Sequence, residues 1–317
     1  MTIKEIANEL KTATAVLIFS HNRPDGDTLG SATALRLALK KLGIRADIVC
    51  NGDVPDKLKY LKGSEEISKI PSHGVCYSAH VSVDCSTEGM FTELYSFYKK
   101  NTVTFNVDHH VSNSRYAKFN YVEETAAACE IIYNLIKELG VQIDSDIADC
   151  LMTGIVTDTG AFCHSNVTHN TLYVASVLKK AGSNLHNIIK FNFKNQTKQR
   201  SDLYARVISK MRYRLDGKVG ILTITKKDLE ETGAVDNLTE GFIDYPLSVD
   251  TVEVAISLLE TGTNRYKISF RSKGKVNVNE IASIYGGGGH VLASGAVING
   301  YLEDVIDKLC YNVEQRL

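Results

Sequence analysis

Acidic and histidine residues recur in this sequence directly after short apolar runs. The first group, His21-Asn-Arg-Pro-Asp25-Gly-Asp27, follows an apolar run that ends at Phe19. Three further groups follow apolar runs in the same way: Asp84, the triplet Asp108-His109-His110, and Asp158. An isolated buried carboxylate costs far more free energy than it returns, so several at the ends of buried elements need compensating positive charge. A pair of divalent metal ions would supply that charge.

The types of these side chains indicate which metal would bind. Carboxylates and imidazoles without a thiolate suit hard ions, so we expect Mn²⁺, two ions per site, with Mg²⁺ or Co²⁺ as alternatives. Two ions about 3.5–4 Å apart can lower the pKa of water and clamp both oxygens of an in-line displacement at phosphorus. The residues therefore predict hydrolysis of a phosphate ester.

The elements that would position these groups alternate between strand and helix. Apolar runs predict strands at 15–19, 46–50, 79–83 and 102–107. Helical periodicity appears at 28–42, 90–99, 126–139, 146–157 and 168–180. This alternation predicts an α/β fold with a doubly wound parallel sheet, in which ligands bind at the carboxyl ends of the strands.

The second half of the sequence predicts a different pattern of elements, with more strands than helices. After Asp216-Gly217, strand patterns appear at 219–225, 252–259 and 266–271, and a helical pattern covers 302–313. We expect a catalytic, metal-binding domain at 1–185, a helical linker at 186–214 and a smaller α+β domain at 215–317, with a cleft between the two domains. The 190–218 segment has nine Lys or Arg against two Asp, which would suit a nucleic-acid path but is more typical of a solvated linker helix.

Four consecutive glycines, Gly286 to Gly289, precede His290 and form a second candidate site. Such a run lets the backbone approach a ligand closely and turn its N–H groups onto an anion. It lacks the Gly-Lys-Ser/Thr ending of a P-loop. A glycine run alone is more often a flexible loop, and it is His290 together with Arg271-Ser272 at a strand end that favours an anion site.

Composition narrows the class of protein. The 317 residues include 36 Lys or Arg and 37 Asp or Glu, a net charge of −1, which gives no general attraction for long duplex nucleic acid. Seven scattered cysteines without a C-x-x-C pair indicate reduced thiols. The amino terminus is charged and no run of 18 apolar residues occurs, so we expect a cytoplasmic protein with no membrane partner.

Five segments carry a family resemblance. In order and spacing, HNRPDGD, VSVDCS, NVDHH and GIVTDTGAF resemble the four motifs of the DHH phosphoesterase family, and GGGGH resembles its DHH-associated carboxyl-terminal domain. The resemblance implies that His21 and Asp25 hold a first metal. It implies that Asp27, His109 and Asp158 hold a second, with Asp84 bridging both.

The resemblance also implies the residues that act on the substrate. Beside the bridging Asp84, Asp108 would orient the two histidines rather than bind metal, and His110 would face the substrate phosphate as electrophile or proton donor. In the second domain, the implied substrate-binding residues are Arg271, Ser272, Gly287, Gly288, Gly289 and His290.

The length, and the lack of a sensory or membrane domain in this sequence, resemble the nano-RNase and pAp-phosphatase branch of the family. This implies hydrolysis of short oligoribonucleotides and of the 3′-phosphate of adenosine 3′,5′-bisphosphate (pAp). A cyclic or linear dinucleotide phosphodiesterase is the alternative, because it would use the same metals. A non-catalytic nucleotide sensor is disfavoured, since no expected ligand is missing. The expected partners are short RNA, pAp and other small nucleotides; no obligate protein partner is expected, and a homodimer is left open.

Overall fold

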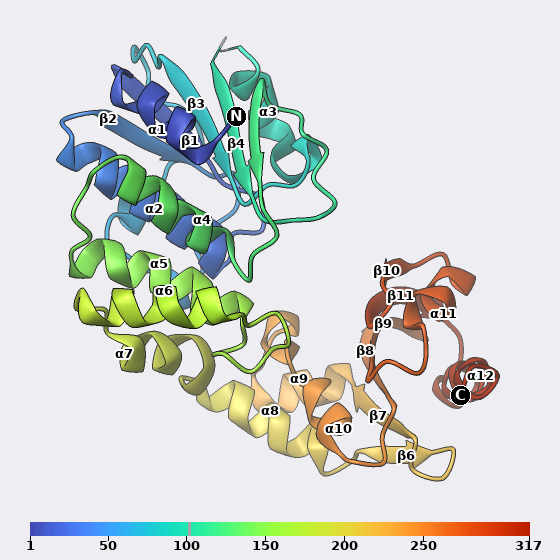
Figure 1. Ribbon diagram of the computed structural model, residues 1–317. Helices are drawn as coiled ribbons and strands as arrows, with labels where there is room; N and C mark the ends of the chain where they lie inside the picture. Colours follow the sequence, from blue (N-terminus) through green and yellow to red (C-terminus); the bar gives the residue numbers. More distant parts are fainter. Residues whose placement is uncertain (101–102) are drawn as a thin grey trace. The chain divides into compact units, whose positions relative to one another are not determined.

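The computed structural model in Figure 1 describes residues 1–100 and 103–317. The chain divides into two compact units, Met1–Asn195 and Gln196–Leu317, and each has its own sheet and its own hydrophobic core. The first sheet is parallel and the second is mixed. The predicted fold class, an α/β unit followed by a smaller α+β unit, is therefore confirmed.

A five-stranded parallel sheet in the order β2-β1-β3-β4-β5 forms the centre of the first unit. Its strands are β1 (Ala15–Phe19), β2 (Arg45–Val49), β3 (Ala79–Val83), β4 (Thr104–Asp108) and β5 (Phe119–Val122). The first four were predicted, although Thr102, the first residue of the fourth predicted strand, lies outside the described residues. Every residue of β1, β3 and β4 is buried, as is typical of parallel strands covered on both faces.

Helices cover both faces of this sheet (Figure 1). Ile18 packs into the larger core, and the next residue, Phe19, packs against Phe91 on the opposite face. The helices are α1 (Ile3–Lys11), α2 (Gly26–Lys41), α3 (Thr92–Tyr98), α4 (Ala128–Glu138), α5 (Ser145–Asp158), α6 (His169–Lys180) and α7 (Leu185–Ile189), with short 3₁₀ turns at Asp56–Leu58, Ser64–Glu66 and Glu88–Phe91.

Two glycines allow α2 and α5 to pack closely. A Cβ on Gly30 would lie 2.4 Å from the carbonyl oxygen of Cys150, and one on Gly154 would lie 2.5 Å from Oδ1 of Asp27. Both distances are far below van der Waals contact, so a larger side chain would push the helices apart. The close approach brings the start of α2 beside the end of α5, which carry Asp27 and Asp158 respectively.

The helical linker expected at 186–214 is not a single helix. It is divided into α7, a π-helical turn at Lys190–Lys194, the separate helix α8 (Lys198–Ile208) and a short strand β6 (Arg212–Arg214). The side chain of Thr197 caps α8 by accepting from the N–H of Arg200. The new helix therefore has its own start signal inside the predicted one.

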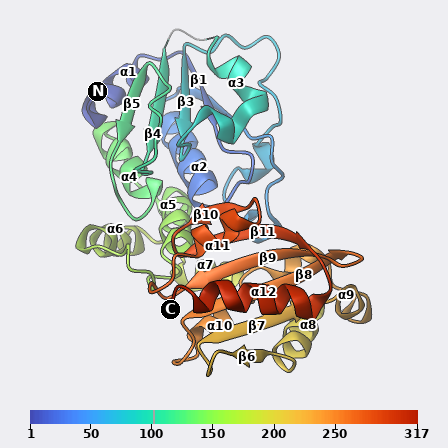
Figure 2. The ribbon, with the colours of Figure 1, turned by 90° about the vertical axis from the view of Figure 1, so that its right-hand side faces the viewer.

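The second unit is a six-stranded sheet in the order β10-β11-β9-β8-β7-β6. After β6 its strands are β7 (Val219–Ile224), β8 (Val254–Gly262), β9 (Arg265–Ser272), β10 (Gly288–His290) and β11 (Ala293–Asn299). Helices α11 (Val278–Ile284) and α12 (Leu302–Glu314) pack on one face, and α12 is seen along the sheet in Figure 2. Helices α8 and α9 (Lys226–Thr232) pack on the other face, and the 3₁₀ turn Asp236–Thr239 and helix α10 (Asp244–Ser248) lie between α9 and β8 in the chain.

Candidate active site

The side chains predicted to bind metal converge at one edge of the first sheet. Strands β1, β3 and β4 are neighbours and parallel, so their carboxyl ends meet. His21 follows β1, Asp84 directly follows β3, and His109 directly follows β4. Asp25 and Asp27 lie at the start of α2, and Asp158 is the last residue of α5.

These residues form two groups of potential metal ligands, His21 with Asp25 and Asp84, and Asp27 with His109 and Asp158. A third group joins Asp84 to His109 and His110. In the first group, Nε2 of His21 lies 3.6 Å from Oδ2 of Asp25 and 3.5 Å from Oδ2 of Asp84. In the second, Nε2 of His109 lies 3.8 Å from Oδ2 of Asp27 and 3.7 Å from Oδ2 of Asp158. Asp84 approaches His109 with its other oxygen, Oδ1, at 3.4 Å.

The geometry fits shared cations better than direct hydrogen bonds. Separations of 3.4–3.8 Å between imidazole and carboxylate are longer than ordinary charge-assisted hydrogen bonds. Oδ1 of Asp84 is buried and has no hydrogen-bond partner among the described residues. A buried carboxylate oxygen left in this way is costly, and a divalent cation between the oxygen and imidazole ligands would stabilise it.

The charges of the cluster also indicate a need for cations. Burial raises the pKa of Asp158 and of Asp27, and the neighbouring carboxylates raise both further. Burial works to lower the pKa of His21, but the close carboxylates of Asp25 and Asp84 outweigh it and raise that pKa to about 10. In the absence of metal ions, the cluster would therefore bind protons to balance its negative charge.

Two potential ligands are held in place by main-chain groups. The N–H groups of Ala128 and Cys129, at the start of α4, donate to the two carboxylate oxygens of Asp27 at 2.5 and 2.9 Å. Nδ1 of His109 lies 2.9 Å from the carbonyl oxygen of Thr125. A carbonyl can only accept, so Nδ1 of His109 carries a proton, and Nε2 is the ring nitrogen that faces the cluster.

Asp84 is also unusual in its backbone. Its φ is +54°, in the left-handed region that a residue with a Cβ seldom adopts, and its N–H donates to the carbonyl oxygen of Val107 at 3.0 Å. Such strain is typical of functional positions and costs about 1–3 kcal/mol. Here it accompanies the turn of the chain out of β3 at the point where both oxygens of Asp84 face histidines.

Asp108 and His110 form a separate pair beside the two groups. Oδ1 of Asp108 accepts from Nδ1 of His110 at 2.8 Å, and this hydrogen bond raises the pKa of His110. Nδ1 of His110 also lies 3.7 Å from Asp84, but its proton is committed to Asp108. Of the two histidines, only His110 is hydrogen-bonded to Asp108. His109 is oriented by the carbonyl oxygen of Thr125 instead.

The predicted substrate-binding residues of the second unit fall on two faces of its sheet. Cross-strand pairing places His290, Ala293 and Arg271 in one row, so His290 and Arg271 share a face two strands apart, roughly 10 Å. Gly288 also lies on this face. Ser272 and Gly289 belong to the opposite face, and Oγ of Ser272 accepts from the N–H of Gly274.

The glycine-rich segment is a strand rather than the expected loop over part of its length. Gly288–His290 form β10, paired with β11. A Cβ on Gly287 would lie 2.1 Å from the carbonyl oxygen of Gly295, and Gly289 has a φ of +151°. Close packing on β11 therefore requires glycine at these two positions whatever the segment binds.

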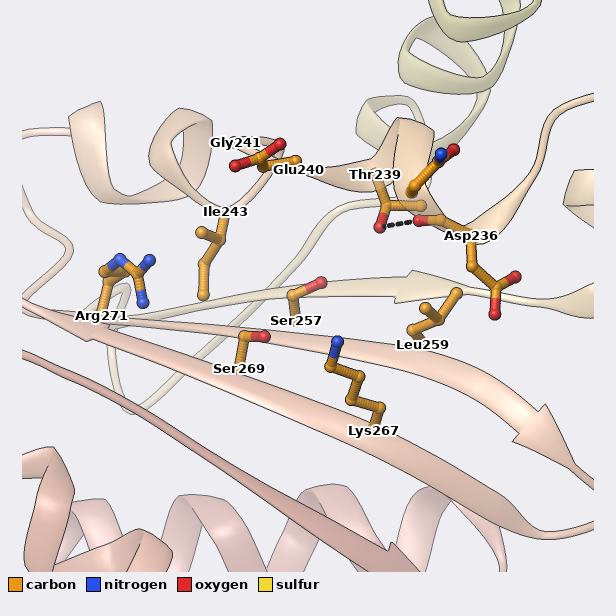
Figure 3. A pocket seen from close by; sticks show the side chains of 11 residues that line it. Asp236, Thr239, Glu240, Gly241, Ile243, Ser257, Leu259, Lys267, Ser269 and Arg271 are labelled. Atoms are coloured by element: carbon orange, nitrogen blue, oxygen red, sulfur yellow. Dashed lines mark hydrogen bonds between the residues drawn. The ribbon is translucent and has the colours of Figure 1, made fainter. Parts of the chain in front are cut away.

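A pocket of about 530 Å³ lies beside Arg271 within the second unit (Figure 3). Its floor includes Ser257, Lys267, Ser269 and Arg271 from β8 and β9, and its wall is the 236–243 segment. Arg200 holds this wall by donating to the carbonyl oxygens of Leu238 and Glu240. The pocket thus has two cationic side chains, Lys267 and Arg271, on its floor and two acidic residues, Asp236 and Glu240, in its wall.

Comparison with known proteins agrees with this geometry. Residues 15–155 match the DHH family, N-terminal domain, and residues 218–317 match the DHHA1 domain. The bifunctional oligoribonuclease and PAP phosphatase NrnA of Thermus thermophilus is 31% identical over 310 residues, which cover 95% of this chain and 90% of that protein. This chain belongs to the DHH phosphoesterase family.

Solved structures show the same fold as this DHH phosphoesterase. An exopolyphosphatase-related protein from Bacteroides fragilis has a TM-score of 0.89 and 25% identity, covering 99% of this chain and 95% of that one. The exonuclease RecJ bound to manganese has a TM-score of 0.57 and 14% identity, covering 100% and 95%. Among residues 1–100 and 103–317 of the DHH phosphoesterase, no helix is long and apolar enough to cross a bilayer.

Several residues around the phosphoesterase site were not found from the sequence. Thr125 orients His109 through its main chain, and any residue type could do so. Nδ2 of Asn166 donates to the carbonyl oxygen of Asp158. Asn113, three residues after the DHH triplet, reaches Asp108 through the turn of the loop after β4, and its residue type alone gives no signal of that contact.

Proposed function

We propose that this DHH phosphoesterase uses Mn²⁺ to hydrolyse short oligoribonucleotides and the 3′-phosphate of pAp. The main support is the pair of ligand groups joined by Asp84, in a chain 31% identical to a bifunctional oligoribonuclease and PAP phosphatase. The carboxylate and imidazole set favours a hard ion, and RecJ, which shares the fold, has been solved with manganese.

The two ligand groups would each hold one ion. His21 and Asp25 would hold the first, and Asp27, His109 and Asp158 would hold the second. Asp84 would serve both groups, since one of its oxygens faces His21 and the other faces His109. Bound metals supply Lewis acidity toward the phosphoryl oxygens and lower the pKa of water. The protein's own contribution is preorganisation, because the N–H groups of α4 and the Thr125 carbonyl fix Asp27 and His109 before any ion arrives.

His110 would act on the substrate phosphate. Its side chain is 37% exposed, Nδ1 is bound to Asp108, and Nε2 is left to contact a ligand. Because Asp108 raises the pKa of His110, the imidazole keeps its second proton to higher pH and can donate from Nε2 to a phosphoryl or leaving oxygen.

The second unit would bind the nucleotide. Arg271 and His290 share one face of the sheet, and Arg271 lines the pocket that also contains Lys267. A guanidinium suits a phosphate, and Ser269 on the same face beside Arg271 suits one of its remaining oxygens. Lys267 lies four residues, roughly 13 Å, away along β9 and would meet a different part of the ligand. The predicted contribution of Ser272 is less direct, since its side chain lies on the opposite face.

A ranking of substrates tests the proposed function. Purified protein with Mn²⁺ would be given pAp, a short RNA, pGpG, cyclic di-AMP and a long RNA, and initial rates compared. We expect the short RNA and pAp to be hydrolysed fastest. Faster turnover of pGpG or cyclic di-AMP would favour the dinucleotide phosphodiesterase, and no turnover of any ester by manganese-loaded protein would favour a sensor.

A further inference from the structure

We propose that Asn113 is a positioning residue for His110 and acts through the carboxylate of Asp108. This inference rests on the proposed function, because it assumes that His110 acts in hydrolysis. It adds a residue outside the metal ligands and the DHH triplet, and it predicts that Asn113 and His110 work as one unit.

Asp108 is held at both of its oxygens. Oδ1 accepts from Nδ1 of His110 at 2.8 Å, and Oδ2 accepts from Nδ2 of Asn113 at 2.6 Å. Asp108 is fully buried, so water does not replace a missing donor easily. The bond from Asn113 therefore fixes the carboxylate plane, and the carboxylate plane fixes the direction of the imidazole.

The orientation of the Asn113 amide is settled by its other end. Oδ1 of Asn113 accepts from the main-chain N–H of Arg115 at 2.7 Å. A flipped amide would place NH₂ against that N–H and an oxygen against Asp108, with two repulsive contacts. The observed orientation is thus the one in which Asn113 donates to the carboxylate.

A buried network anchors Asn113 to the sheet. Its Nδ2 also lies 2.8 Å from Oδ1 of Asn106, a fully buried residue of β4. Nδ2 of Asn106 has acceptors at 3.1 Å in Ser82 Oγ, Cys85 O and Tyr116 Oη, so its carbonyl oxygen is the atom that faces Asn113. His110 is thereby connected through Asp108 and Asn113 to the rigid centre of the sheet.

The decisive test is a double-mutant cycle between Asn113 and His110. Turnover is measured with Mn²⁺ on pAp and on bis-p-nitrophenyl phosphate for wild type, Asn113→Ala, His110→Ala and the double variant. We expect Asn113→Ala to lower kcat by about 10- to 100-fold through misplacement of the imidazole, with KM and bound manganese nearly unchanged. In the His110→Ala background the same change should cost less than about twofold, because the two residues act together.

Asn120, in β5 directly after the same loop, provides a matched control. Its amide closes the loop through main-chain atoms of Ala117 and Arg115, so Asn120→Ala should lower thermal stability without the loss of kcat. Asn113→Asp keeps the size and the acceptor for the Arg115 N–H but puts an oxygen against Asp108. Asn113→Asp should lose at least as much kcat as Asn113→Ala. It replaces the alanine variant in the cycle if that variant does not fold.

The inference would be overturned if the losses of kcat for Asn113→Ala and His110→Ala multiplied in the double variant, because the two residues would then act independently. It would also be overturned if His110→Ala kept the full kcat. If Asn120→Ala lost as much kcat as Asn113→Ala, the role of Asn113 would be only to stabilise the loop. Failure of the proposed function looks different: pAp would not be hydrolysed by wild type. The cycle would still be measured on bis-p-nitrophenyl phosphate.

Discussion

Oδ1 of Asp84 lies 3.4 Å from Nε2 of His109 and has no hydrogen-bond partner among the described residues. Its other oxygen faces His21. We therefore predict that Asp84→Asn abolishes hydrolysis of every substrate and removes both metals, because neither group keeps its shared oxygen. Bound manganese by elemental analysis and turnover measure this. A variant with more than a small residual activity would refute the bridging role.

The control for Asp84 is Asp53→Asn, which makes the same charge change at a side chain that is 97% exposed and paired with Lys69. Exposed ion pairs contribute about 0–1 kcal/mol, so activity and metal content should stay at the wild-type level. Without metal, Asp84→Asn should unfold at a temperature no lower than wild type, since it removes charge from a cluster of carboxylates.

Metal removal should destabilise the first unit. Metal bound only by the folded state adds RT ln(1 + [M]/Kd), about 2.7 kcal/mol at a hundredfold excess over Kd. We expect EDTA to abolish activity and lower the unfolding temperature, Mn²⁺ to restore both, and thiol reductants alone to restore neither. Calorimetry with and without Mn²⁺ checks this. Full activity in protein that contains only zinc would contradict the choice of metal.

Adjacent glycines of the second unit should differ sharply in stability. A Cβ on Gly287 would meet the carbonyl oxygen of Gly295 at 2.1 Å, whereas one on Gly288 would have Oδ1 of Asn279, at 3.8 Å, as its nearest atom. We predict that Gly287→Ala lowers the free energy of unfolding by about 1–3 kcal/mol, and that Gly288→Ala changes it much less. Urea denaturation measures the difference, and equal losses would mean that β10 does not pair with β11 as described.

Asp228 gives a pH prediction away from the metal site. Its side chain is 1% exposed; burial favours the neutral acid, but hydrogen bonds from Lys210, Thr225 and Arg206 outweigh it and lower the pKa of Asp228. A lowered folded-state pKa contributes stability above the unfolded value of about 3.9, and this contribution is lost as the pH falls toward the folded pKa. Asp228→Asn should therefore cost about 2 kcal/mol at neutral pH and progressively less below about pH 4.

The control for Asp228 is Glu303→Gln, whose carboxylate is 60% exposed beside Arg212. It should cost less than about 1 kcal/mol at neutral pH because solvent screens the pair. Chemical denaturation at a series of pH values compares the two. A cost for Asp228→Asn that does not change with pH would show that the lost contacts are not electrostatic.

The sequence predicted the elements whose signal is local. β1 is a continuous apolar run, and β3 has apolar residues at alternate positions, so both were found with the residues that follow them, His21 and Asp84. It missed the strands β5, β6, β10 and β11. β5 is a half-buried edge strand of four residues, and β10 has three residues, two of them glycine, so neither has a hydrophobic period.

Contacts made across the fold were also outside the reach of the sequence. The Thr125 carbonyl behind His109 leaves no trace in residue type, and the Asn113 amide finds Asp108 only when the loop after β4 turns back. The prediction of one linker helix was wrong because the amphipathic pattern continues through a point where the helix ends. A new helix begins there after the Thr197 cap. Pattern alone does not register such a break.

The division of labour between the two units gives the last prediction. The potential metal ligands all precede residue 160, whereas Arg271 lies on the second sheet, where its guanidinium donates only to the neighbouring Phe270 carbonyl among the contacts of the described residues. If Arg271 binds a terminal phosphate, Arg271→Ala loses a charge-assisted bond of about 1.5–3 kcal/mol, or roughly ten- to hundredfold in kcat/KM for pAp.

The loss should be much smaller toward bis-p-nitrophenyl phosphate, because that ester has no second phosphate for Arg271 to hold. Arg265→Ala removes a guanidinium from the start of the same strand, outside the residues that line the pocket, and should leave both substrates unaffected. Comparing the two substrates on wild type and both variants isolates the phosphate contact from any general effect on β9. Equal losses on both substrates for Arg271→Ala would mean that Arg271 supports the fold, and the assignment of phosphate binding to this strand would be withdrawn.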